Sequence, residues 1–149
     1  MSDTQQYCTF FVADRFLGVD VKCVQEVMRY QEMTPVPLAS AVVSGLINLR
    51  GQIVTALDLR ARLGLPPRAA GTLPMNIVVR TEDGAVSFLV DEIGDVVEVP
   101  ESSRESVPET LTASNRELIA SVCKLQDRLM LVLDTERAIA ETAPAPLRG

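Results

Sequence analysis

Short apolar runs that come in pairs, each pair joined by a brief polar turn, constrain the fold of this chain more than any other feature. Such pairs predict β-hairpins, because a short turn brings one strand back beside the other. In one pair the turn is Glu82-Asp83-Gly84, and Asp-Gly between aliphatic runs is a strong hairpin signal. The four predicted hairpins have strands at 6–12 and 16–21, 46–49 and 52–58, 75–81 and 85–90, and 118–125 and 128–133, and a further strand is predicted at 95–99.

The composition favours a mainly β, globular fold. Hydrophobic residues make up 47% of the 149 residues and charged residues 23%, which is enough apolar material for a packed core. Aromatic residues are only 4% and tryptophan is absent, so the core must consist of Val, Leu, Ile and Ala. The β-branched members of this set favour strands. The length allows one ordinary domain, or two half-size units that share a core.

Short helices are predicted where an aspartate ends a strand and can cap the next turn. Asp20, Asp58 and Asp134 occupy such positions. After Asp58, Leu63 lies on the predicted apolar face, and the helix after Asp134 is predicted to run through Ala140. The apolar residues after Asp20 follow the spacing of one helix face, at Val21, Val24, Val27 and Met28.

Prolines and polar residues mark the predicted loops. Pro35 and Pro37 enforce an extended segment before the second hairpin. Residues 68–74 are predicted to be a linker, and residues 101–115, rich in Glu, Ser, Thr and Pro, form the longest predicted loop. The tail, residues 142–149, is predicted to be frayed.

The two halves of the chain resemble each other. Gly18-Val19-Asp20 near the end of the first hairpin recurs as Leu89-Val90-Asp91 near the end of the third, and Val24–Val27 is echoed by Val96–Val99. The second and fourth hairpins end in similar strings before a short helix, Ala56-Leu57-Asp58 and Val132-Leu133-Asp134. Matches in one order predict two similar β subdomains, each with about five strands.

Charge and residue content exclude several classes of function. A net charge of −6 and a pI near 4.7 oppose electrostatic binding to nucleic acid or anionic lipid. Apolar runs are too short to span a membrane and the N-terminus has no signal-peptide core, so a cytoplasmic location is expected. Histidine is absent, which removes Ser-His and Cys-His nucleophiles and His-containing metal sites. Phosphate-binding loops are also absent, and no cofactor is expected.

Cysteines and clustered acids have ordinary structural explanations. Cys8, Cys23 and Cys123 lack metal-site spacing and are predicted to be reduced thiols in the core. The acidic residues between 91 and 98 are predicted to be solvated. An alternative is a histidine-free acid/base enzyme that uses Asp91 and Asp95, which would need two nearby carboxylates with different pKa values.

One stretch resembles a known family. Residues 43–54, read as VSGLINLRGQIV and followed by Asp58-Leu59-Arg60, look like the signature of CheW, the bacterial chemotaxis coupling protein. Val24-Gln25-Glu26-Val27 upstream, and Val78-Val79 with Phe88–Asp91 downstream, add to the match. The resemblance covers roughly residues 5 to 140.

The resemblance implies a fold of two SH3-like, five-stranded β-barrel subdomains with short helices and a groove between the subdomains. The expected single domain is 5–141, with one subdomain at about 17–72 and the other at about 73–134. The N-terminal strand could be shared between them.

The resemblance also implies an adaptor instead of an enzyme. CheW-family proteins link the cytoplasmic tips of chemoreceptors to the regulatory domain of the histidine kinase CheA. The expected location is in receptor arrays beneath the inner membrane, without direct membrane insertion. A small-ligand-binding β protein without catalytic activity is the alternative.

Six residues are predicted to bind partners. Arg50 matches the arginine of the family's N-L-R-G turn, which also contains Asn48 and Gly51, and Glu26 matches the glutamate of its V-Q-E segment. Glu26 and Arg50 are expected to form or support a charged contact near the receptor groove, with Val24 and Val27 as an apolar surface beside it. The alternatives are a solvated turn residue for Arg50 and ordinary helix core for the two valines.

Overall fold

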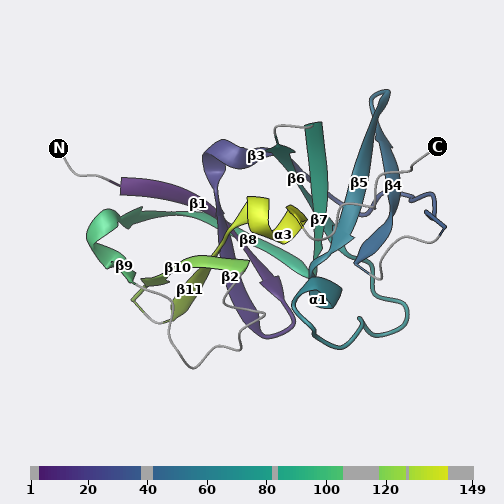
Figure 1. Cartoon of the computed structure of the whole chain (residues 1–149). Coiled ribbons are helices and arrows are strands. Elements are labelled where there is room, and N and C mark those ends of the chain that lie inside the picture. Colours follow the sequence, from purple (N-terminus) through teal and green to yellow (C-terminus); the bar gives the residue numbers. More distant parts are fainter. Residues whose placement is uncertain (1–3, 38–41, 82–83, 106–117, 127, 141–149) are drawn as a thin grey trace.

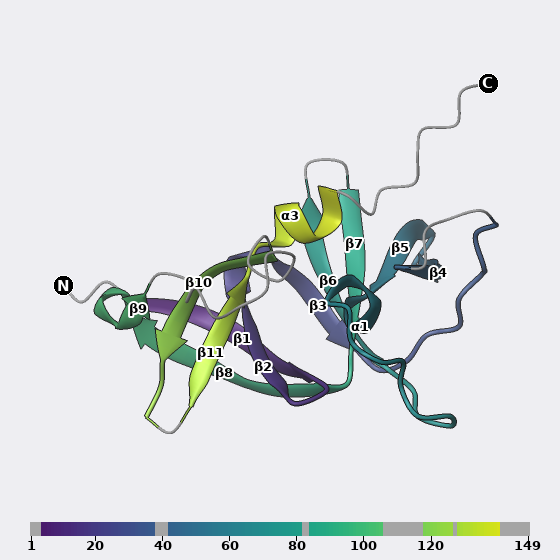
Figure 2. The ribbon, with the colours of Figure 1, turned by 60° about the horizontal axis from the view of Figure 1, so that its bottom comes forward.

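The computed structural model describes residues 4–37, 42–81, 84–105, 118–126 and 128–140. Strands in these residues form two sheets that lie side by side (Figures 1 and 2). The first has the order β8-β1-β2-β11-β10-β9, with β1 at Thr4–Val12, β2 at Arg15–Asp20, β8 at Glu92–Pro100, β9 at Arg104–Glu105, β10 at Ile119–Lys124 and β11 at Leu129–Leu133. The second has the order β3-β6-β7-β5-β4, with β3 at Val24–Met28, β4 at Val43–Leu49, β5 at Gln52–Asp58, β6 at Met75–Thr81 and β7 at Gly84–Val90.

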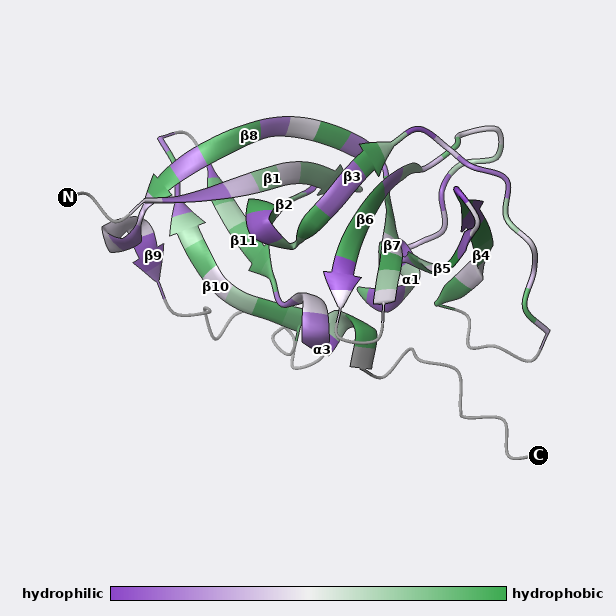
Figure 3. Cartoon of the chain, turned by 90° about the horizontal axis from the view of Figure 1, so that it is seen from above, coloured by the Kyte–Doolittle hydropathy of each residue, from purple (hydrophilic) through white to green (hydrophobic). Residues whose placement is uncertain are grey.

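The predicted mainly β fold and all four predicted hairpins are confirmed. The antiparallel pairs are β1 with β2, β4 with β5, β6 with β7, and β10 with β11. Figure 3 shows polar and apolar segments mixed along strands such as β8, as expected for strands with unlike faces. Parts of the predicted turns at 82–83 and 127, of the loop at 106–115, and the tail at 142–149 lie outside the described residues.

Short helices follow four of the described strands, and the three predicted caps are present. The helices are η1 at Val21–Cys23, α1 at Leu59–Arg62, η2 at Glu101–Ser103 and α3 at Thr135–Ala140. The Asp20 side chain accepts a hydrogen bond from the Lys22 N–H, and Asp58 accepts one from the Arg60 N–H. Asp134 in the same way accepts from the Arg137 N–H.

The helix predicted through Val27 and Met28 is wrong beyond its first turn. After η1 the chain becomes strand β3, which pairs antiparallel with β6. The hydrogen bonds of this pairing, together with the strand preference of valine, outweigh the helical spacing of the apolar residues. A partner strand, β6, that is remote in the sequence therefore decides the local structure.

The two sheets have the same topology, which confirms the predicted internal similarity. In the first sheet the hairpin β1–β2 joins the hairpin β10–β11 through the parallel pair of β2 with β11. In the second sheet the hairpin β6–β7 joins β4–β5 through the parallel pair of β7 with β5. β8 and β3 occupy equivalent edges, and β9 adds a short sixth strand to the first sheet.

The predicted boundary between subdomains near residue 72 does not match the sheets. The second sheet runs from β3 to β7, residues 24–90, whereas the first combines residues 4–20 with residues 92–133. The first sheet thus combines the first hairpin of the N-terminal half, β1–β2, with the second hairpin of the C-terminal half, β10–β11. The second sheet combines the other two hairpins, β6–β7 and β4–β5. The extent of the whole domain, 5–141, stays a prediction.

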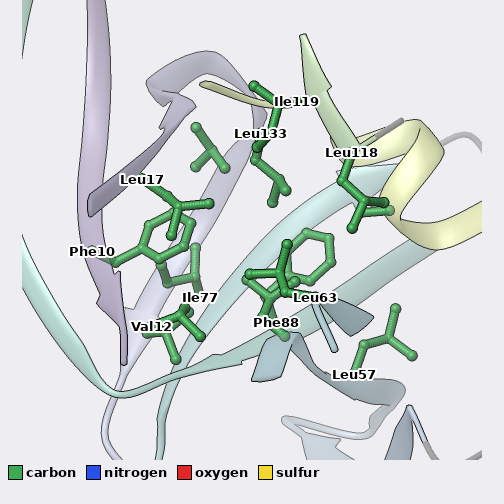
Figure 4. Packing of buried hydrophobic residues seen from close by; sticks show 14 of the residues in the cluster. Phe10, Val12, Leu17, Leu57, Leu63, Ile77, Phe88, Leu118, Ile119 and Leu133 are labelled. Atoms are coloured by element: carbon green, nitrogen blue, oxygen red, sulfur yellow. The ribbon is translucent and has the colours of Figure 1, made fainter. Parts of the chain in front are cut away.

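The largest hydrophobic cluster lies between the sheets and takes residues from both. Phe10 and Leu17 of the first sheet meet Ile77 and Phe88 of the second, and all four are at most 1% exposed (Figure 4). Each sheet also holds a smaller cluster, with Tyr7, Val99, Cys123, Met130 and Val132 in the first and Ile47, Leu49, Val54 and Val78 in the second. The sheets therefore share one core.

Cys123 is buried as predicted, and Cys8 and Cys23 are half-buried free thiols.

Asp91 ties the sheets together at the point where β7 leads into β8. Its carboxylate accepts hydrogen bonds from Arg60 in α1, with Nη2 to Oδ2 at 2.7 Å, and from the Ala13 N–H in the β1–β2 turn. Arg68 Nε lies 2.8 Å from Asp91 Oδ1. One carboxylate thus joins three segments that are remote in sequence.

Candidate functional site

The turn between β4 and β5 has an unusual backbone. Leu49 pairs with Gln52, so the turn consists of Arg50 and Gly51 alone, with φ angles of 53° and 87°. Positive φ at both central residues of a two-residue hairpin defines a type I′ turn. The Asn48 side chain accepts a hydrogen bond from the Gly51 N–H, with Oδ1 to N at 2.9 Å. Glycine adopts this geometry freely, whereas arginine does so at a cost.

Arg50 reaches from this turn to Glu26 in β3. Arg50 Nη1 donates to Glu26 Oε2 at 2.6 Å and Nη2 donates to Oε1 at 2.9 Å, which is a bidentate ion pair. The hydrogen bonds and negative charge of Glu26 raise the pKa of Arg50. The Arg50 side chain is 74% exposed and that of Glu26 21%. The predicted charged contact between the two residues is therefore present on the surface.

This ion pair lies where the second sheet closes on itself. β3 and β4 are opposite edges of that sheet, yet Glu26 of β3 contacts the residue that follows β4. The chain beyond β3 also pairs with β4, because Thr34 and Leu46 exchange both backbone hydrogen bonds at 2.8 Å. We call these contacts, Glu26–Arg50 and Thr34–Leu46, the seam. The sheet must curl strongly to form it.

Two features that the sequence analysis missed allow the seam to form. A Cβ on Gly45 would lie 2.7 Å from the Thr34 carbonyl oxygen, so only glycine permits the crossing at this point. Buried Asn76 donates to the Arg29 carbonyl at 3.1 Å and accepts from Ser87 at 2.7 Å, which fixes the chain as it leaves β3. In the sequence, the signals for these features were Gly45 inside an apolar strand and Asn76 near the start of another strand.

The predicted valines face the same side of β3 but differ in exposure. Val24 lies opposite Val79 and packs at half burial against the shared core. Val27 lies opposite Ile77 and is 39% exposed. Both are strand residues, so the alternative of an ordinary helix core does not apply. Ile53, which the sequence analysis did not select, pairs with Asn48 and is 61% exposed.

Asp91 does not have the character of a catalytic acid. Burial alone would raise its pKa, but hydrogen bonds from Arg60 and the Ala13 N–H, and the charges of Arg68 and Arg60, outweigh burial and lower it. The predicted alternative needs a carboxyl that exchanges protons near neutral pH, and Asp91 is held as an anion. The described residues contain no group of three or more His, Cys, Asp or Glu side chains that could hold a metal ion.

Within the described ranges, none of the helices is long and apolar enough to cross a membrane.

Two similar sheets that share one core define the class of this protein as a mainly β domain built from two related sheets. A family model described as "CheW-like domain" matches residues 6–143, so the chain belongs to the family of CheW-like domains. The family resemblance seen in the sequence is confirmed.

The relatives of this chain are chemotaxis proteins. The chemotaxis protein CheW of Bacillus subtilis is 30% identical over 135 residues, which cover 91% of this chain and 86% of the relative. That of Thermotoga maritima is 30% identical, with 89% and 86% covered. Among solved structures, the scaffolding protein TtCheW from Thermoanaerobacter tengcongensis aligns with a TM-score of 0.80 and 25% identity over 90% of each chain. These findings support an adaptor role in chemotaxis.

Proposed function

We propose that this chain couples chemoreceptors to the histidine kinase CheA in chemosensory arrays and has no catalytic activity of its own. The observation that carries the proposal is the family match over residues 6–143, which spans nearly all of both sheets. Its partners would be the cytoplasmic tip of a receptor and the regulatory domain of CheA. The chain would act in the cytoplasm, in arrays beneath the inner membrane.

The seam offers a surface for one of these partners. Glu26 takes two of the five N–H donors of the Arg50 guanidinium, so the same group can donate to a partner without losing Glu26. Val27, on the opposite face of β3 from Glu26, supplies exposed apolar area beside the seam, and Val24 extends that face toward the core. Asn48 and Gly51 complete the proposed partner-binding set through the turn that presents Arg50.

The ion pair is better suited to binding than to stability. Exposed ion pairs contribute little to folding, because water and salt screen them. A guanidinium that is already oriented loses less conformational freedom when a partner binds. Links of this kind are weak individually and become strong when many act at once, which suits a reversible array.

The proposal is tested by measuring binding of the full chain to a chemoreceptor cytoplasmic fragment and to the CheA regulatory domain, both from the same organism. Arg50→Ala is expected to weaken binding to at least one of them about tenfold or more, since arginines at interfaces are frequent hot spots. Arg137→Ala is the matched control, because Arg137 is 66% exposed and paired with Asp134 on a different element. Wild-type chain that binds neither partner would overturn the proposal.

A further inference from the structure

The Asn48 side chain accepts a hydrogen bond from the central peptide group of the turn, which lies outside the paired residues of the hairpin. Leu49 and Gln52 are the paired residues that close the hairpin. The Gly51 N–H belongs to the central peptide, between Arg50 and Gly51, and Asn48 Oδ1 accepts from it at 2.9 Å. The orientation of the central peptide distinguishes a type I′ turn from its flipped form.

This peptide controls where Arg50 points. Rotation of the Arg50–Gly51 peptide changes ψ of Arg50 and φ of Gly51 together. At a positive φ, an arginine is accommodated only in the small left-handed region, which the bond to Asn48 selects. Other turn types with negative φ would aim the Arg50 side chain elsewhere. Because that side chain is 74% exposed, packing does little to hold it.

We propose that Asn48 is a positioning residue that acts through Arg50: its side chain fixes the turn, and the turn sets the Arg50 guanidinium in register with Glu26 and with a partner. The inference rests on the proposed function for the role of Arg50. It differs from the simpler assignment of Asn48 as a direct partner contact, in which the amide itself would touch the partner.

A double-mutant cycle separates these two roles. Binding to the purified receptor fragment and to the CheA domain is measured for the wild-type chain, Asn48→Ala, Arg50→Ala and the double variant. Asn48→Ala is expected to weaken binding about 3- to 10-fold, the usual effect of one hydrogen bond. In the Arg50→Ala background it is expected to have no further effect, because no guanidinium remains to be positioned.

Two more variants distinguish positioning from general support of the fold. Asn48→Asp keeps an oxygen acceptor for the Gly51 N–H, so binding is expected within about twofold of wild type. Thr81→Val is the control, because the Thr81 hydroxyl donates to the Gly84 carbonyl at 2.7 Å, at another hairpin of the same sheet. It is expected to leave binding unchanged even if it lowers the melting temperature.

The outcomes are distinguishable. If Arg50→Ala weakens binding while Asn48→Ala binds as well as wild type, the positioning role is overturned and the proposed function stands. Equal losses from Asn48→Ala in the two backgrounds would show a direct contact instead, as would failure of Asn48→Asp to restore binding. If Arg50→Ala binds both partners normally, the proposed role of Arg50 fails, and the positioning role fails with it.

Discussion

Arg50 occupies a backbone position that glycine or asparagine would fill at lower free energy. Its φ of 53° lies in the left-handed region, which costs an L-residue about 1 kcal/mol relative to glycine. The Glu26 pair returns little stability, because Arg50 is largely exposed. Strained residues with exposed functional groups are typical of sites where stability has been given up for binding.

At the scale of the residue, Arg50→Gly is therefore expected to unfold at higher denaturant than Arg50→Ala, by about 1 kcal/mol in the free energy of unfolding. Both variants are expected to lose binding equally, since neither carries a guanidinium. Chemical denaturation and a binding titration on the same samples measure the two effects. Equal stability of the two variants would show that the turn is not strained at this position.

At the scale of the element, the seam depends on the close passage of the Thr34 segment over β4. A Cβ at position 45 would meet backbone and the Met33 Cβ at 2.7 to 2.9 Å, and a backbone atom cannot move aside cheaply. Gly45→Ala is expected to lower the free energy of unfolding by about 1–3 kcal/mol, as overpacking does. Hydrogen exchange should become faster at the amides of Thr34 and Leu46.

Ser44→Ala, one residue earlier on the same strand, is the matched control and is expected to change stability by less than about 0.5 kcal/mol. If the Thr34 and Leu46 amides of Gly45→Ala exchanged hydrogen at the wild-type rate, the claim that Gly45 is needed for the seam would be wrong.

Elements set by local signals could be predicted from the sequence, and those set by remote partners could not. The four hairpins follow from adjacent apolar runs and their turns, and Asp20 caps η1 as expected. β3 was mistaken for helix because its apolar spacing fits a helix, while β6 pairs with it only in the folded chain. Glu26 and Arg50 were selected from the family resemblance, but the curl of the sheet that brings them together depends on Gly45 and Asn76.

At the scale of the whole molecule, the halves of the chain exchange hairpins between the sheets. The repeated sequences identify the equivalent strands correctly. They do not predict which of two equivalent hairpins belongs to which sheet. That choice is made by non-local pairs, β2 with β11 and β5 with β7. The exchange makes each sheet depend on both halves, so neither half is expected to fold alone.

The contacts of Asp91 with Arg60, Arg68 and the Ala13 N–H join the two sheets, and we expect their contribution to stability to depend on pH. Its pKa is lowered in the folded chain. It therefore stabilises the fold above its unfolded-state pKa of about 3.9, and this stability is lost as the pH falls through the lower folded-state value. Asp91→Asn leaves Arg60 and Arg68 without their shared anion and is expected to cost about 2–4 kcal/mol at pH 7.

The stability difference between wild type and Asp91→Asn is expected to narrow as the pH falls below about 4. Urea titrations between pH 7 and pH 3 measure it, with Asp14→Asn, at an exposed position in the neighbouring β1–β2 turn, as the control. A difference that stays constant over this range would mean that the charge of Asp91 is not what holds the joint.

The most direct test of coupling is whether the chain bridges its two partners. Membranes that contain a chemoreceptor are mixed with CheA from the same organism, with and without this protein, and are then sedimented. The account predicts that CheA sediments with the membranes in much greater amount when the wild-type chain is present, and that Arg50→Ala removes most of the increase. Sedimentation of CheA that is the same with and without the chain would contradict the coupling role.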